Sequence, residues 1–136
     1  MVELTDPARI TAAVVLLTVV GIESGGIFLV RVVSGRVPAT DFQRAFYRAG
    51  HAHAGVLVTL GLVCLVLSHA TSLGGIAGWL ASSGVLVAAA LMSGGFFAAS
   101  AGPGRTRPNR WIWILWLGAA FLAAGVVSLA VGLLAG

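Results

Sequence analysis

The sequence predicts an all-α membrane protein, a single domain over residues 1–136 built as a bundle of four transmembrane helices. Of its 136 residues, 59% are hydrophobic and only 9% are charged, and the mean hydropathy is +1.04. Apolar runs cover residues 10–33, 49–68, 73–99 and 111–135. Each run reaches the roughly 20 residues that a helix needs to cross the hydrocarbon core of a bilayer. Little chain is left outside these runs, so any chemistry is expected within the bilayer or at its surface.

The first run contains an acid where lipid disfavours one. Residues 1–9 carry Glu3 and Asp6, unlike the positively charged start of a cleavable signal peptide, so the run is expected to stay as a span. Within it, Gly21 and Gly25 have the GxxxG spacing that lets two membrane helices approach closely. Glu23 lies between them, and its charge costs several kcal/mol in a bilayer unless it is neutralised, paired or hydrated. Glu23 is therefore the first candidate functional residue.

The second run begins with two histidines. Thr40, followed three residues later by Gln43, fits a capping box, so this helix is expected to begin at about residue 41. Residues two apart on a helix are rotated by about 200°, so His51 and His53 cannot face the same neighbour. His51 continues a polar stripe through Tyr47. We expect His51 to pair with Glu23, which lies at a neighbouring depth, and His53 to make a separate contact.

The fourth run carries a packing signal. Small residues recur there at every fourth position: Ala120, Ala124, Ser128, Gly132 and Gly136. A ridge of small residues predicts close contact with another membrane helix, within the chain or in a second subunit. In the third run, Ser82, Ser83 and Ser93 are weaker candidates, because serine in membrane helices more often packs and bonds its own backbone.

A repeated motif predicts an internal duplication. Ser24-Gly25-Gly26 resembles Ser93-Gly94-Gly95, and a Gly-Arg pair follows each motif at the same distance. The first and third runs cross the membrane in the same direction, so the repeat would be a parallel duplication of a two-helix unit. In this alignment Glu23 corresponds to Met92, and the second half lacks the acid.

The charge distribution predicts the orientation in the membrane. All eight basic residues are arginines, and seven of them lie in or beside the first and third connections. The positive-inside rule then places these connections in the cytoplasm and both termini outside. The composition favours a bacterial source, so the expected location is the bacterial cytoplasmic (inner) membrane. Arginines that flank spans do not form a phosphate-binding patch. The expected partners are the lipid bilayer and further subunits, in a homo-oligomer or a membrane complex, and not nucleic acid.

Three functions follow from the acid and the histidines. The first, narrowly favoured, is a site for a transition metal or haem with His51, His53 and Glu23 as ligands, because imidazole and carboxylate are common ligands. The second is a proton-coupled transporter or channel subunit whose relay is Glu23, His51 and Tyr47. The third is a structural accessory subunit in which Glu23 only holds helices together. The sequence has no catalytic triad or nucleotide motif, and its single cysteine, Cys64, is expected to pack as an inert thiol.

Overall fold

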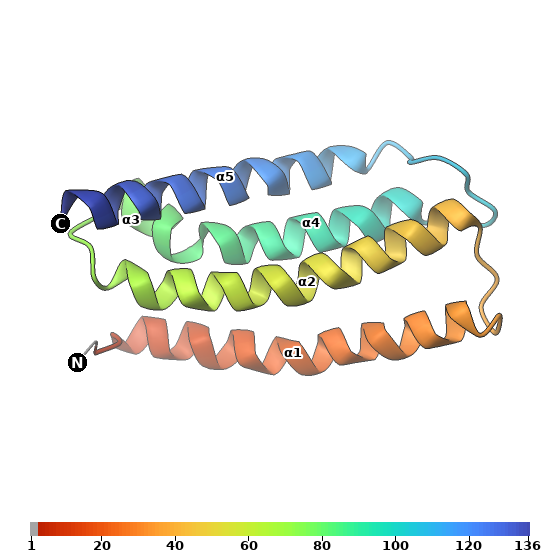
Figure 1. Cartoon of the computed structure of the whole chain (residues 1–136), viewed down its shortest axis with the longest axis horizontal. Helices are drawn as coiled ribbons and strands as arrows, with labels where there is room; N and C mark the ends of the chain where they lie inside the picture. Colours follow the sequence, from red (N-terminus) through yellow and green to blue (C-terminus); the bar gives the residue numbers. More distant parts are fainter. Residues whose placement is uncertain (1–2) are drawn as a thin grey trace.

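The chain folds into four antiparallel helical rods (Figure 1). A computed structural model describes residues 3–136. Three rods are continuous helices: α1 (Asp6–Val33), α2 (Asp41–Ser68) and α5 (Ile112–Ala135). The remaining rod is built from α3 (Gly75–Trp79), the π-helical turn η1 (Leu80–Gly84) and α4 (Val85–Ser100). Each rod is long and apolar enough to cross a membrane, and all regular structure in residues 3–136 is helical. The predicted all-α membrane fold with four spans is confirmed.

The rods are not packed equally. Helices α2, α4 and α5 contact one another, whereas α1 packs chiefly against α2 and lies at the side of the bundle (Figure 1). Among the described residues of α1, only Ala8 and Val32 are buried. Both termini and the α2–α3 connection lie at one end, which we call the termini end; the connections over residues 34–40 and 101–111 lie at the other. The outer face of α1 is therefore free for lipid or for another subunit.

Glycines set the spacing between α4 and α5. A Cβ added at Gly125 would lie 3.1 Å from both the Leu80 oxygen and the Val85 nitrogen, so the two backbones are almost in contact. The buried glycines of α5 are Gly118, Gly125 and Gly132. They recur every seven residues, which is close to two full turns, so they stay on one face of α5. Residues spaced four apart instead rotate around the helix by about 40° at each step. Of the predicted ridge, Gly132 is buried, Ala124 and Ser128 are half-buried, and Ala120 and Gly136 are exposed.

Polar side chains tie the start of α2 to the α4–α5 connection. The predicted capping box is present, with Thr40 and Gln43 bonding each other's backbone N–H groups. The buried Gln43 also donates through Nε2 to the oxygens of Ser100 at 3.1 Å and Gly102 at 2.7 Å. The Thr40 hydroxyl donates to the Arg105 oxygen. One glutamine thus caps its own helix and holds a neighbouring connection.

The two halves of the chain form comparable antiparallel pairs, α1 with α2 and α4 with α5. The repeated motif occupies matching places in them. Gly26 faces His51 on the next helix of the first half, and Gly95 faces Leu115 on the next helix of the second. The two contacts differ in tightness, because a Cβ at Gly26 would make an ordinary contact with the imidazole whereas one at Gly95 would clash with the Leu115 backbone. Internal duplication stays a prediction.

Candidate functional site

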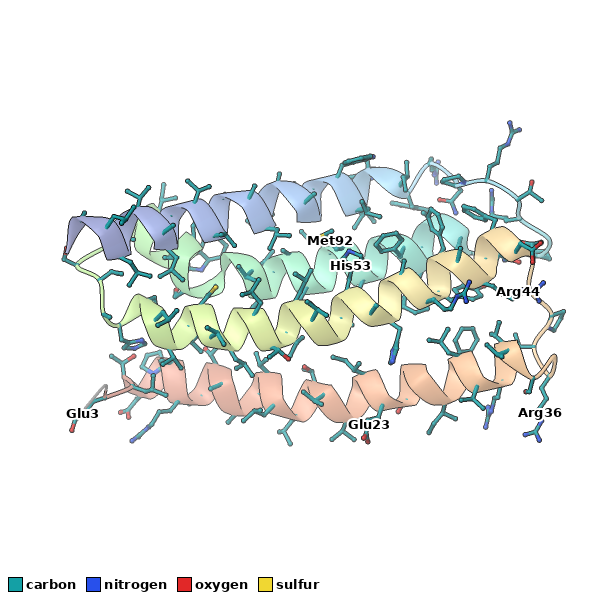
Figure 2. The ribbon with its side chains drawn as sticks, viewed as in Figure 1. Glu3, Glu23, Arg36, Arg44, His53 and Met92 are labelled. Atoms are coloured by element: carbon teal, nitrogen blue, oxygen red, sulfur yellow. The ribbon has the colours of Figure 1, made fainter. Side chains whose placement is uncertain are left out.

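Glu23 and His51 line the same groove between α1 and α2. The groove has a volume of about 580 Å³, and its other lining residues are Val19, Ile22, Gly26, Ile27 and Val30. Glu23 is exposed and lies on the outer side of α1 (Figure 2), while His51 is half-buried on α2. No hydrogen bond joins them, and within residues 3–136 neither side chain bonds another group. The acid thus lies at the rim of the groove and the imidazole at its base.

The His51 imidazole packs against two glycines of α1 and most tightly against Gly25. A Cβ added at Gly25 would lie 3.2 Å from Nδ1 of His51, and one added at Gly26 would lie 3.6 Å from Nε2. Gly21, the other glycine of the GxxxG pair, has nothing within 4 Å of such a Cβ. The tight α1–α2 contact is therefore made at Gly25, where the imidazole fills the space of the missing side chain, whereas a Cβ at Gly26 would make an ordinary van der Waals contact.

His53 lies on a different side of α2, as the helical phase requires. Its ring packs against Phe96 of α4 at a centroid distance of 5.0 Å, and Figure 2 places it between the two helices. Its Nδ1 is 2.7 Å from the Ala49 oxygen, so Nδ1 carries a hydrogen and donates. His53 is thereby held in an aromatic contact and does not face the groove of Glu23 and His51.

Tyr47 lies one turn before His51 on α2 and bridges three helices. Its ring contacts Phe28 of α1 edge-on at 5.1 Å and stacks with Phe97 of α4 at 5.7 Å. Its hydroxyl oxygen accepts a long hydrogen bond of 3.5 Å from Nε2 of Gln43. Of the polar stripe predicted on α2, Tyr47 and His51 both reach α1, Tyr47 at Phe28 and His51 at Gly25.

The predicted metal ligands do not converge in the part of the chain that the structure describes. Within residues 3–136, no three His, Cys, Asp or Glu side chains lie close enough to hold one ion. His51 and His53 face different helices, and Glu23 is the only other ligand type lining the groove. A metal or haem site stays a prediction.

A second, more polar pocket lies at the termini end. Its volume is about 370 Å³ and its walls come from the start of α1, the end of α2, the α2–α3 connection and η1. The polar side chains that line it are Thr5, Thr11, Ser68, His69, Thr71, Ser82 and Ser83. Sequence reasoning did not predict this pocket, because these residues come from distant segments and each is ordinary in its own surroundings. The clustering of serine and threonine at the ends of the runs was the one available signal.

Both sites are built from groups that the fold brings together from separate helices. The groove joins α1 to α2, and the polar pocket joins α1, α2 and η1. No protein-family model, no curated protein and no solved structure matches this chain.

Proposed function

We propose that this protein exchanges protons at Glu23 and His51 and acts as a proton-coupled transporter or channel subunit in a bacterial inner membrane. The observation that carries the proposal is the groove that both side chains line between α1 and α2. A carboxyl group within a membrane span is a functional candidate by default, because its charge is costly there. An imidazole titrates near neutral pH and is the natural exchange partner.

Once the Glu23 side chain turns into contact with His51, the pair can pass a proton without changing its total charge. A neutral acid with a neutral imidazole, and a carboxylate with an imidazolium, both sum to zero. The bilayer penalises net charge most strongly, so an exchange between these two states costs less than ionising either group alone. The His51 ring lies against Gly25 and Gly26, which keeps it beside the turn of α1 that bears Glu23.

The proposed protein works with further subunits. The outer face of α1 is apolar and exposed, and it carries Glu23 at the groove rim. A second subunit on this face would cover the carboxyl group and separate it from lipid. In the same proposal, the arginine-rich connections face the cytoplasm and both termini face outward.

Proton flux into liposomes tests the proposal. Purified protein is reconstituted in vesicles that contain a trapped pH-sensitive dye, and a potassium gradient with valinomycin drives proton entry. We expect Glu23→Gln and His51→Gln to lower the proton flux at least tenfold. The matched controls are Glu3→Gln, an acid outside the spans, and His53→Gln, a histidine on a different side of α2; neither should change the flux.

A second readout covers the case in which an unknown solute must move together with the proton. Infrared difference spectra between two pH values detect protonation of a carboxyl group with no transport at all, and the Glu23 band should vanish in Glu23→Gln. Folded protein that shows neither flux nor this band would exclude the proton function. Metal content and a visible spectrum of the same preparation test the metal or haem alternative, for which His51→Gln should remove the bound species.

A further inference from the structure

Most of the polar side chains that line the pocket at the termini end already donate their hydrogen to a backbone carbonyl. The Ser68 hydroxyl donates to the Leu65 oxygen at 2.8 Å, Thr71 donates to the Ser68 oxygen at 2.8 Å, and Ser82 donates to the Trp79 oxygen at 3.2 Å. A hydroxyl group that donates to a carbonyl still has lone pairs to accept with. These three side chains therefore offer oxygen acceptors to the pocket.

His69 adds a nitrogen acceptor. Its Nδ1 is 2.9 Å from the Leu65 oxygen, so Nδ1 carries a hydrogen and donates to that carbonyl. In the neutral imidazole, Nε2 is then the acceptor. Thr5 and Thr11 contribute hydroxyls from the start of α1, and these can accept as well as donate.

The pocket also has features that suit a cation. None of its lining residues is an arginine, so no positive side chain competes for the acceptors. Trp79 lines one wall and is exposed, and its ring contacts Phe121 of α5 edge-on at a centroid distance of 6.2 Å. An indole ring attracts cations through its electron-rich face. A volume of about 370 Å³ falls in the range of small-molecule sites. The pocket lies at the end of the bundle, where a charged group keeps access to water.

We infer that this pocket binds a primary ammonium group. Such a group has three N–H donors and one positive charge, which complement several oxygen acceptors, the Nε2 acceptor of His69 and the ring of Trp79. Hydrogen bonds from a charged donor are stronger than neutral ones, so an ammonium group gains more from these acceptors than a neutral ligand does. The inference does not depend on the proton function, because the pocket shares no residue with the Glu23–His51 groove.

The π-helical turn η1 shapes this site. Ser82 and Ser83 both line the pocket from η1, and their hydroxyl oxygens lie 3.3 Å apart. Consecutive residues on a helix differ by about 100° in direction, and the widened π turn lets both line one pocket. Isolated π turns of this kind occur frequently at functional sites.

Binding of methylammonium tests the inference. In a variant with Trp111, Trp113 and Trp116 replaced by phenylalanine, Trp79 is the sole tryptophan, and its emission on selective tryptophan excitation reports occupancy. We expect saturable methylammonium binding, weaker tetramethylammonium binding because that cation has no N–H donor, and no acetate binding. Tetramethylammonium as tight as methylammonium, or acetate binding in place of methylammonium, would overturn the assignment.

Substitutions locate the site. Thr71→Val and Ser82→Ala should each weaken methylammonium binding on the order of tenfold, because each removes an acceptor for a charged donor. Ser34→Ala is the matched control: its hydroxyl makes the same kind of bond, to the Arg31 oxygen at 3.2 Å, at the opposite end of the bundle. Circular dichroism checks the folding of each variant. Affinities in Thr71→Val and Ser82→Ala equal to that of Ser34→Ala would place methylammonium elsewhere.

A lipid headgroup and a soluble amine present the same ammonium chemistry. Nanodiscs with and without phosphatidylethanolamine separate the two sources. If the headgroup occupies the pocket, its presence should weaken methylammonium binding in the wild-type chain, and native mass spectrometry should find less of this lipid on Thr71→Val. If the source is a soluble amine, methylammonium affinity should be the same in both kinds of nanodisc.

Discussion

Two adjacent glycines of α4 meet opposite surroundings. A Cβ added at Gly95 would lie 2.6 Å from the backbone nitrogen of Leu115, whereas one added at Gly94 would meet nothing within 4 Å. A backbone atom cannot rotate away, so α4 and α5 must separate to accept the methyl group. Gly95→Ala should lower the free energy of unfolding by about 1–3 kcal/mol, while Gly94→Ala should leave it unchanged or raise it by up to about 1 kcal/mol. Denaturation in detergent measures both, and equal stabilities would contradict the packing described.

The positions of the candidate site residues could be predicted from the sequence only in part. The separation of His51 from His53 was predictable, because helical rotation is a local property. That His51 faces α1 and lines one groove with Glu23 followed from similar depths on consecutive helices, but no hydrogen bond pairs them, because Glu23 lies on the outer side of α1. The exposure of Glu23 was not predictable, because α1 has exposed apolar residues such as Leu17, Val20 and Ile27. A helix that is apolar all round gives no pattern to tell its inner side from its outer side.

At the level of whole elements, α5 shows why hydropathy alone cannot locate a contact face. Both the four-residue series from Ala120 to Gly136 and the seven-residue series Gly118, Gly125 and Gly132 are present in the sequence. The structure buries the second series, because near-integral turns keep one face of α5 against α4 at Gly118, against η1 at Gly125 and against the α2–α3 connection at Gly132. The π turn η1 had no sequence signal at all. In the structure it packs against α2 and α5.

The hydrogen bonds of Gln43 at the start of α2 can be tested by substitution. Gln43→Glu keeps the shape of the side chain and an oxygen for the Thr40 N–H, but it replaces the Nε2 donor by an acceptor facing the Ser100 and Gly102 oxygens. Two carbonyls would lose their donor, at a cost of about 1–3 kcal/mol. The variant should unfold more easily, and trypsin should cleave the connection after Arg105 faster than in the wild-type protein.

Asp41→Asn is the control for this change. It alters an exposed ion pair with Arg44 two residues before Gln43 and touches no part of the α4–α5 connection. Its trypsin cleavage rate should match that of the wild-type chain. If Gln43→Glu behaves in the same way, the connection is held by something other than this glutamine.

Charged residues are distributed asymmetrically along the long axis of the molecule. Arg36 and Arg44 lie at one end of the bundle and Glu3 at the other (Figure 2), and both termini share the end with Glu3 (Figure 1). An even number of spans made this arrangement predictable from the sequence. The lateral position of α1 was not, because four apolar helices can pack as a symmetric bundle or as three plus one at similar burial. The bilayer does not favour either arrangement, since an apolar helix face is covered equally well by lipid and by a neighbouring helix.

The orientation of the whole molecule in the membrane can be tested by cysteine labelling. Seven of eight arginines flank two connections at one end, and positively charged connections stay on the cytoplasmic side. In a Cys64→Ala background, a single cysteine at Ser72 should react with an impermeant maleimide in intact bacterial cells. A cysteine at Ser34 should react only after the cells are permeabilised, and one at Thr106 must behave like Ser34, since both connections share one end. The reverse pattern would invert the molecule, place the polar pocket in the cytoplasm, and limit its ammonium ligands to those found inside the cell.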